Sequence, residues 1–324
     1  MIRRIALTMA AAGMALTACS DEGGSSSGTT VAPTTQPAVS TTAESTTTTL
    51  SPDKAQLLYT SDEGTPGVFQ LWVVNADGSD AHAITNGPFS HFHPSWSPDG
   101  TKIVFSSNGD GHQGLFVVNA DGTGEVQIST DGHAQSPAWS PDGTKIAFDT
   151  KAPGPYPFLL YVMNADGSNV VKLTPLDNDE YSAAWSPDGT KIAFAVQDFE
   201  GNDIYAINTD GSGLVVLTDA GGENDQPAWS PDGTRIAFMS TRDDGAHGQI
   251  YVMNADGTEQ QALTSDPIHH AYPSWSPDGG RIAYDAGDTA NYATFEIYVM
   301  NADGTDSKAI TANGADDGVP IWVP

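Results

Sequence analysis

Short apolar runs separated by turn residues recur along the chain from residue 51 to the C-terminus. A representative stretch contains four such runs, at Pro94–Trp96, Lys102–Phe105, Leu115–Val118 and Val126–Ser129. β-branched and aromatic residues dominate these runs, and this length and composition predict β-strands. We name the four strands of each unit A, B, C and D in chain order.

Two short motifs join these strands. Ser-Pro-Asp-Gly follows strand A, and Asn-Ala-Asp-Gly or Asn-Thr-Asp-Gly follows strand C. Both suit a type I turn followed by a glycine that accepts positive φ, so both predict tight hairpins. A tryptophan ends strand A in every unit, and the six tryptophans stand 43 to 47 residues apart, at Trp96, Trp139, Trp185, Trp229, Trp275 and Trp322.

Six repeats of a four-stranded unit predict an all-β fold, a six-bladed β-propeller around a central channel. The first unit begins at the A–B turn, Ser51-Pro52-Asp53, and lacks a convincing strand A before it. The last residues, Val319–Trp322, form a strand A that no unit follows. We therefore expect the C-terminal strand to pair into the first blade as its innermost strand, which closes the ring and removes an open edge.

The repeated text resembles a known family. Trp-Ser-Pro-Asp-Gly-Thr-Lys-Ile-Ala-Phe, followed by Ile-Tyr-Val-Met-Asn-Ala-Asp-Gly, is similar to the repeat of the TolB-type propellers, which are distant relatives of the WD-repeat family. The resemblance covers residues 51–324 and implies the fold; propellers host many unrelated activities, so it does not imply one function. TolB-type proteins also carry an N-terminal α/β domain, for which residues 20–50 are too short and too polar.

The first 18 residues have a different character. Arg3 and Arg4 precede an apolar run from Ile5 to Ala18 that is too short to span a bilayer, which predicts a secretory signal peptide. The run ends in Leu16-Thr17-Ala18-Cys19, which resembles a bacterial lipobox. That resemblance implies that Cys19, the one cysteine of the sequence, becomes the lipidated N-terminus after cleavage.

A polar segment follows the cysteine. From Ser20 to Leu50, 16 of 31 residues are Ser or Thr, so the segment cannot bury enough apolar surface to fold and is expected to be a flexible tether. The predicted organisation is a signal peptide over 1–18, a lipidated cysteine and linker over 19–50, and the propeller over 51–324. We expect a lipoprotein outside the cytoplasm, in the periplasm or on the cell surface, which touches the membrane through its lipid anchor alone.

The two ends of the blades differ in sequence. Antiparallel strands alternate in direction, so the A–B and C–D turns lie on one face, the turn face, and the B–C and D–A loops lie on the other, the loop face. The turn face repeats its twelve aspartates, counting Asp53, and we interpret them as turn formers. The six tryptophans are expected to pack between blades. The loop face varies from unit to unit, which is typical of a binding surface.

Charge narrows the possible partners. The formal charge is −29, and it becomes −31 once the two arginines of residues 1–18 are removed. Such a surface repels nucleic acid and anionic lipid, whereas a protein or peptide with basic segments, or a cation, fits it. The alternative interpretation is that the acidity keeps a monomeric extracytoplasmic protein soluble.

Two function classes follow. The first is a non-enzymatic protein or peptide interaction module, with no catalytic residues, whose loop face presents five acids: Asp179, Glu180, Asp225, Asp316 and Asp317. The second is a metal-dependent propeller enzyme, a lactonase-like hydrolase or a saccharide lyase, suggested by the histidines of the D–A loops.

The histidines give the candidate metal site. His91 and His93 are two residues apart, so in an extended strand they point to the same side, and the positions five and six residues before each tryptophan are expected to approach the channel mouth. We expect at most one divalent ion, such as zinc, manganese or nickel, and no other cofactor. The ion would be held by a subset of five histidines, with carboxylates as further ligands or as partners of the histidines: His91, His93, His133, His269 and His270. Neutral histidines that line the channel or lie at the surface are the favoured alternative.

Overall fold

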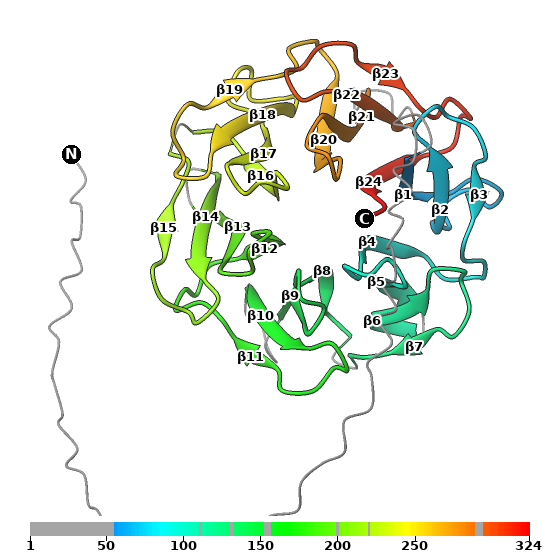
Figure 1. Cartoon of the computed structure of the whole chain (residues 1–324), viewed down its shortest axis with the longest axis horizontal. Helices are drawn as coiled ribbons and strands as arrows, with labels where there is room; N and C mark the ends of the chain where they lie inside the picture. The colour runs from blue at the N-terminus through cyan, green and yellow to red at the C-terminus, as the bar shows by residue number, and fades with distance from the viewer. Residues whose placement is uncertain are drawn as a thin grey trace, which may run out of the picture. The chain divides into compact units, whose positions relative to one another are not determined.

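The computed structural model describes residues 55–109, 112–129, 132–151, 157–198, 201–219, 221–288 and 294–324. Their 24 strands form six antiparallel sheets of four strands, arranged as blades around a central channel (Figure 1). This confirms the predicted all-β, six-bladed propeller. Among the described residues, no helix has the length and apolar character needed to cross a membrane.

Equivalent strands occupy equivalent places in blades 1 to 6. The inner strands, strand A, are β24 (Asp317–Trp322), β4 (His91–Trp96), β8 (Gln135–Trp139), β12 (Glu180–Trp185), β16 (Asn224–Trp229) and β20 (His269–Trp275). Strand B is β1 (Gln56–Ser61), β5 (Lys102–Gly109), β9 (Lys145–Lys151), β13 (Lys191–Gln197), β17 (Arg235–Ser240) and β21 (Arg281–Gly287).

The outer half of each blade is less uniform in length. Strand C is β2 (Gln70–Asn75), β6 (His112–Asn119), β10 (Phe158–Asn164), β14 (Asn202–Asn208), β18 (Gln249–Asn254) and β22 (Glu296–Asn301). Strand D is short: β3 (His82–Ala83), β7 (Val126–Gln127), β11 (Val171–Lys172), β15 (Val215–Val216), β19 (Gln261–Ala262) and β23 (Lys308–Ala309).

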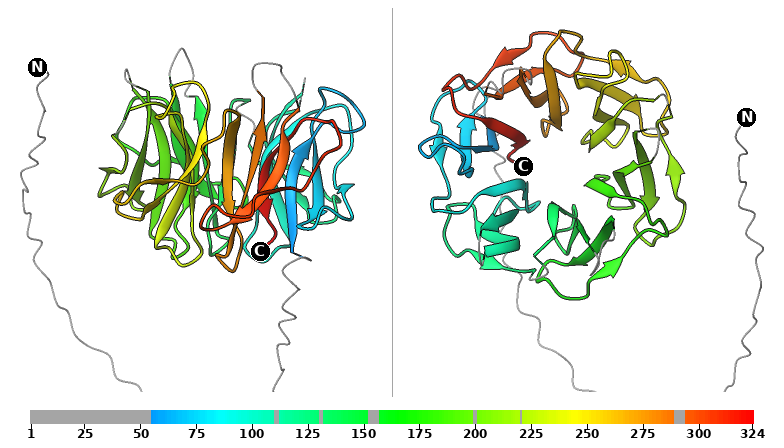
Figure 2. Two further views of the ribbon diagram at one scale, coloured as in Figure 1. Left: turned by 90° about the horizontal axis from the view of Figure 1, so that it is seen from above. Right: turned by 180° about the vertical axis from the view of Figure 1, so that it is seen from behind.

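The two ends of the described chain meet in blade 1. β24 pairs with β1, with Leu57 opposite Trp322 and Ser61 opposite Asp317. The N–H of Val323 donates to the carbonyl of Gln56 at 2.9 Å, so the start of β1 and the C-terminus lie at the same rim (Figure 2). The predicted closure of the ring is confirmed, and this rim is the turn face.

The hydrophobic core lies between neighbouring blades. Six apolar clusters fill the six blade boundaries; the cluster between blades 1 and 2, for example, joins Leu58 and Leu71 to Ile103 and Phe105. Each strand B places a fully buried aromatic ring in this core: Tyr59, Phe105, Phe148, Phe194, Phe238 and Tyr284. Because every boundary needs two blades, a missing strand exposes core on both of its sides.

The tryptophans stabilise the blade boundaries, as predicted. The indole N–H of Trp185 donates to the carbonyl of Ala138 in the preceding blade at 3.1 Å, and that of Trp322 donates to Ser274 at 3.1 Å. Trp229 and Trp275 make the equivalent bonds across their boundaries. The indole N–H groups of Trp96 and Trp139 are buried without a partner among the described residues.

The turn-face aspartates close their own turns, which confirms the interpretation for all of them except Asp53, which lies outside the described residues. Asp99 accepts the backbone N–H of Thr101 at 3.0 Å and the hydroxyl of Ser97 at 2.7 Å. Asp121 accepts the N–H and the hydroxyl of Thr123. These hydrogen bonds favour the carboxylate and lower the pKa of both groups.

Candidate functional site

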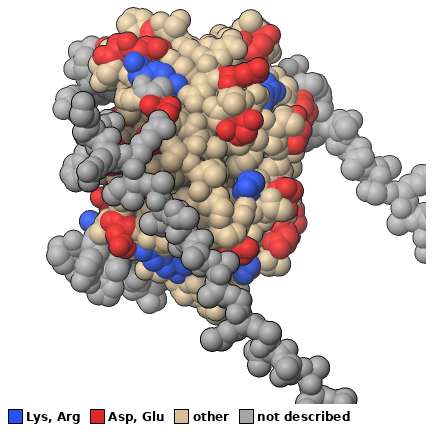
Figure 3. Space-filling view, turned by 90° about the vertical axis from the view of Figure 1, so that its left-hand side faces the viewer, with Lys and Arg blue, Asp and Glu red and all other residues tan. Residues whose placement is uncertain are grey.

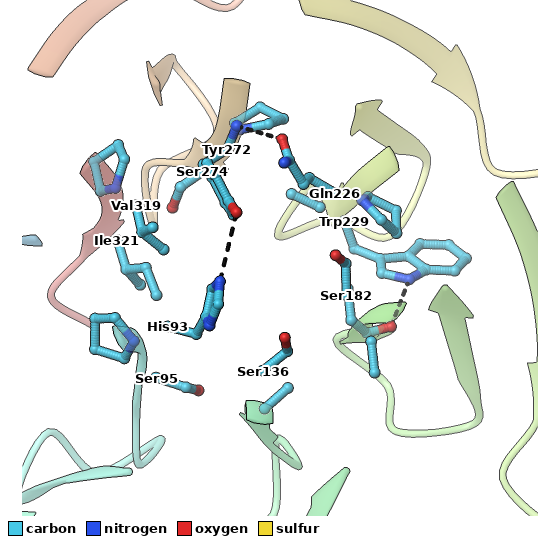
Figure 4. Close-up of a pocket in the computed structure, with 18 of the residues that line it drawn as sticks. His93, Ser95, Ser136, Ser182, Gln226, Trp229, Tyr272, Ser274, Val319 and Ile321 are labelled. Atoms are coloured by element: carbon cyan, nitrogen blue, oxygen red, sulfur yellow. Dashed lines mark hydrogen bonds between the residues drawn. The ribbon is translucent and has the colours of Figure 1, made fainter. Parts of the chain in front are cut away.

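A bulge in every inner strand decides which side chains enter the channel. The residue three positions before each tryptophan has a left-handed φ between 48° and 57°: His93, Ser136, Ser182, Gln226, Tyr272 and Val319. In blade 2, the pairing of β4 with β5 shifts register between Phe92 and Ser95 around this residue. The extra residue turns its side chain toward the channel, and these six side chains gather there (Figure 4).

The channel narrows where two of these side chains meet. The hydroxyl of Tyr272 in blade 6 lies 3.5 Å from Nε2 of His93 in blade 2, and their rings are 6.0 Å apart (Figure 4). Burial lowers the pKa of His93 to about 4 and raises the pKa of Tyr272, so both side chains are neutral at pH 7. The backbone N–H of Tyr272 donates to Oε1 of Gln226 at 2.8 Å, which fixes this strand to blade 5.

The half of the channel nearer the turn face is a cavity of about 300 Å³. Its wall repeats the same residue types in each blade, mainly prolines, serines and alanines of the inner strands, together with the rings of Trp229 and Trp275. This turn-face cavity is largely apolar and contains no ionisable side chain besides His93 and Tyr272 among the described residues.

The half nearer the loop face is different. A recess of about 420 Å³ opens there against blades 6, 1 and 2, and we call it the loop-face recess. It is lined by Thr60, Phe69, Phe92, His93, Gln226, His269, Ala271, Tyr272, Asp285, Phe295, Asp316, Asp317, Gly318 and Val319. His93, Gln226, Tyr272 and Val319 line both the recess and the turn-face cavity, so they form the floor between the two.

Two buried aspartates occupy the same repeat position in strand B. Asp149 follows Phe148 in β9, Asp285 follows Tyr284 in β21, and they are 1% and 3% exposed. Burial raises the pKa of each carboxyl to about 7. Oδ2 of Asp285 accepts the N–H of the bulge residue Val319 in the next blade at 3.0 Å.

These two aspartates lie within strand B and not in the B–C loop that follows it. Strand B extends through both residues, because β9 ends at Lys151 and β21 ends at Gly287. An aspartate directly after an apolar run is typical of a loop. It can lie inside a strand when its hydrogen-bond partner comes from another blade, and the sequence does not show that partner. The signal that was missed is the recurrence of Asp directly after the fixed aromatic of two units.

The five acids expected on the loop face are not equally exposed. Glu180 and Asp317 are both 0% exposed, so they do not present charge at the surface. Glu180 accepts the N–H of Leu160 and the hydroxyl of Thr174, both of which belong to the preceding blade. Here the sequence expectation of surface charge was wrong, because this position begins the inner strand and the side chain of Glu180 bonds to the outer half of the preceding blade.

The other three acids are half-buried at the loop-face end of the inner strands. Asp179 accepts the N–H of Phe158 at 2.7 Å, and Asp316 accepts that of Phe295 at 3.0 Å. Asp225 accepts the N–H of Gln226, and burial raises the pKa of its carboxyl. These three keep part of their surface accessible and remain candidates for an interaction.

The structure does not bring the five predicted histidine ligands together. His91 begins β4 of blade 2 and is buried, with Nδ1 3.1 Å from the hydroxyl of Thr85 in blade 1, whereas His93 faces Tyr272 in the channel. The expectation that they point to the same side was wrong, because the bulge at His93 breaks the alternation of an extended strand.

The remaining histidines have separate environments. His270 is buried with Nε2 2.7 Å from Asp266, and Nδ1 of His269 accepts the N–H of Gly248 at 2.9 Å. His133 is exposed. Within the described ranges, no group of three or more His, Cys, Asp or Glu side chains is close enough to hold one metal ion. Cys19, the predicted lipidation site, lies outside the described residues.

Comparison with known proteins places this geometry in a family. The TolB beta propeller domain matches residues 32–187 and 178–324. The Tol-Pal system protein TolB of Syntrophus aciditrophicus is 40% identical over 52 residues, which is 16% of this chain and 12% of that protein. Dipeptidyl-peptidase 5 of Porphyromonas endodontalis is 32% identical over 85 residues, 25% of this chain and 12% of that protein.

The fold comparison agrees with the sequence comparison. The crystal structure of TolB from Acinetobacter baumannii superposes with a TM-score of 0.74 at 20% identity, covering 85% of this chain and 68% of that one. The matched segments span about an eighth of the curated relatives, so their whole-protein activities do not transfer with the fold. The chain belongs to the TolB β-propeller family.

Proposed function

We propose that this chain is an extracytoplasmic, lipid-anchored propeller that binds a protein or peptide through its loop face. The observation that carries the proposal is the difference between the two ends of the channel. Carboxylates of the turn face are committed to their own turns, as Asp99 and Asp121 are. The loop face holds half-buried acids and a recess whose lining differs from blade to blade.

The path of the chain supports this orientation. β1 starts at the turn-face rim, next to the C-terminal Val323 (Figure 2). The predicted tether and its lipid on Cys19 therefore join the propeller at the turn face.

Charge supports a partner with basic segments. The sequence holds 41 Asp and Glu against 12 Lys and Arg. On the side drawn in Figure 3, acidic side chains are more numerous than basic ones and are spread over the surface. Attraction of this kind accelerates encounter and selects basic surfaces, and added salt weakens it.

A protein-binding function also fits the relatives. One of them is named as a Tol-Pal system protein, and a protein named as part of a system is expected to bind its other components. The enzymatic alternative gains no specific support from the described residues, in which the histidines are dispersed.

The anchor is tested by fractionation of a Cys19→Ala variant. We expect wild type in the membrane fraction and the variant in the soluble fraction. A variant that stays as membrane-bound as wild type would contradict the anchor, whatever the loop face binds.

The loop face is tested by affinity capture with a triple variant, Asp179→Asn, Asp225→Asn and Asp316→Asn. Asparagine keeps an oxygen to accept the local N–H groups but removes the charge. We expect weaker capture and a smaller dependence of capture on salt. The matched control makes the same change on the turn face, at Asp121, Asp166 and Asp256. If only the control variant loses capture while it is still folded, the partner binds the turn face and the proposal is contradicted.

A further inference from the structure

We infer that the loop-face recess is a subsite for an organic cation, the ammonium or guanidinium group of a lysine or arginine side chain that projects from a protein partner. This inference rests on the proposed function, since it names the chemistry by which the loop face would recognise its partner. It is carried by the lining of the recess, which combines aromatic rings with uncompensated carboxyl groups.

The aromatic side chains come from three blades and the loops beside them. A linked series of rings runs from Phe69 to Phe92 at 5.4 Å, then to His93 at 6.5 Å and to Tyr272 at 6.0 Å. A second pair, His269 and Phe295, is in edge contact at 6.0 Å. All six rings are partly exposed, so they face the open recess and are not sealed in the core. The phenylalanine and tyrosine rings among them carry the negative π faces that attract a cation.

Asp285 supplies an unpartnered acceptor in the recess. Its side chain is 3% exposed, and Oδ2 is occupied by the N–H of Val319 at 3.0 Å. Oδ1 is buried with no hydrogen-bond partner among the described residues. A buried acceptor without a partner costs free energy, which a cationic N–H donor in the recess would recover.

No basic group among the described residues fills this role. The lining of the recess contains no Lys or Arg among the described residues. The ion pairs between described residues do not involve Asp285, Asp316 or Asp317. Described cations stack elsewhere, for example Arg242 on Tyr251, and not on the six rings of the recess.

The same groups are poorly suited to a metal ion. Nδ1 of His269 already accepts the N–H of Gly248, and Nε2 of His93 faces the hydroxyl of Tyr272. In the part of the chain that the structure describes, no three ligand side chains converge. A volume of about 420 Å³ admits a side chain and excludes a folded domain, so the cation would arrive on a projecting residue.

The test uses the full chain and end-blocked pentapeptides. Gly-Gly-Arg-Gly-Gly and its lysine counterpart are titrated by NMR, with the citrulline peptide as the neutral isostere of arginine. We expect saturable binding of the charged peptides with Kd on the order of 1 mM, and binding of the citrulline peptide at least about tenfold weaker. Equal binding of the arginine and citrulline peptides would overturn the proposal.

Asp285→Asn is the decisive variant, and Asp149→Asn is its matched control. Both replace a buried aspartate at the same repeat position with raised pKa, but only Asp285 lines the recess. We expect Asp285→Asn to lose at least about tenfold in arginine-peptide affinity and Asp149→Asn to retain it. Phe92→Leu, at a partly exposed ring, gives a second reading if Asp285→Asn does not fold. Retained affinity in both Asp285→Asn and Phe92→Leu would refute the subsite.

Free N-methylguanidinium distinguishes the source of the cation. Tighter binding of this small ion than of the arginine peptide would assign the recess to a free solute and overturn the side-chain proposal. Failure of the subsite can be distinguished from failure of the proposed function. Partner capture that depends on Asp179 but not on Asp285 would leave the loop-face interaction standing and remove the subsite.

Discussion

Aspartates on the turn face and aspartates beside the channel belong to the same repeated units, yet the fold shifts their pKa values in opposite directions. Asp232 accepts hydrogen bonds from Ser230 and Thr234 at an exposed turn, and its pKa falls to about 2. Asp149 and Asp285 are buried in strand B, and desolvation raises their pKa to about 7. On the turn face, ionised carboxylates accept local hydrogen bonds. In the channel wall, the buried carboxyl groups keep their protons to a higher pH.

The two groups of residues also differ in how regularly they recur from unit to unit. Turn-face residues recur because each unit needs the same hairpin, so their partners are two residues away. Channel and loop-face residues differ between units because their partners lie in another blade, as Val319 does for Asp285. Among the aspartates of the two regions, those with local partners recur in every unit, and those with partners in another blade do not.

The largest loss of stability is expected from truncation of β24, the inner strand of blade 1. Truncation after Gly318 removes most of β24, including the buried Trp322 and its bond to Ser274. Loss of a large core aromatic alone costs about 3–5 kcal/mol, and the exposed edge of β1 adds to this. We expect a large fall in melting temperature measured by calorimetry. Deletion of residues 20–45 is the control, and equal falls for the two deletions would contradict closure of the ring.

The second prediction uses pH to contrast the two aspartate classes. The folded state holds a proton on Asp149 between pH 3.8 and about 7, whereas the unfolded state has released it. The native state then binds more protons, so stability falls as pH rises through this window, by at most about 4 kcal/mol for the full shift.

Asp149→Asn removes this contribution, so its free energy of unfolding, measured in urea, should improve relative to wild type from pH 4 to 7. Turn aspartates behave in the opposite way: with a lowered folded pKa, their contribution is present above pH 3.8 and is lost as pH falls toward about 2. If the difference in free energy of unfolding between wild type and Asp149→Asn does not change between pH 4 and 7, Asp149 is ionised in the folded state.

The third prediction tests whether repeated positions are energetically equivalent. Trp185 donates across the blade boundary to Ala138, whereas the indole N–H of Trp139 is buried without a partner among the described residues. Both Trp→Phe changes remove similar ring area, but only Trp185→Phe breaks a hydrogen bond. We expect Trp185→Phe to cost about 1 kcal/mol more in chemical denaturation. Equal costs would mean that the repeated tryptophans act through packing alone.

The smallest effect is expected at a single turn. Asp99→Ala removes the acceptor for Thr101 and Ser97, but water reaches this exposed turn and replaces part of the loss. We expect a fall in melting temperature of roughly 2 °C or less, with capture of a loop-face partner unchanged. Weaker capture by a variant of wild-type stability would give the turn face a binding role.

Much of the architecture could be predicted from the sequence because its determinants are local. The turn motifs carry their own acceptors and positive-φ glycines, such as Gly100. The spacing of the tryptophans counts the blades, and the unmatched strand at Val319–Trp322 indicates how the ring closes. Each of these features needs only neighbouring residues or a count, so one sequence is sufficient.

The channel could not be predicted in the same way. The bulge at His93 reverses the side on which a two-residue spacing would place it, and a left-handed φ at a non-glycine residue has no composition signal. A useful hint was present, because the variable residue before the proline of strand A is the bulge residue in five blades. Sequence alone could not say that this position faces the channel.

The sequence by itself determined the repeat, the blade number, the turn chemistry and the excess of acid. Only the tertiary structure decided which acids are buried, which histidines are isolated, and which rings meet at the loop-face recess. Burial of Glu180 and the placement of His91 depend on residues of the preceding blade, Thr174 and Thr85, and the recess likewise joins Phe92 to Tyr272 and Asp285 across blades. The physical reason is that desolvation and cation recognition depend on neighbours in space, and closure of the ring brings residues far apart in sequence into contact.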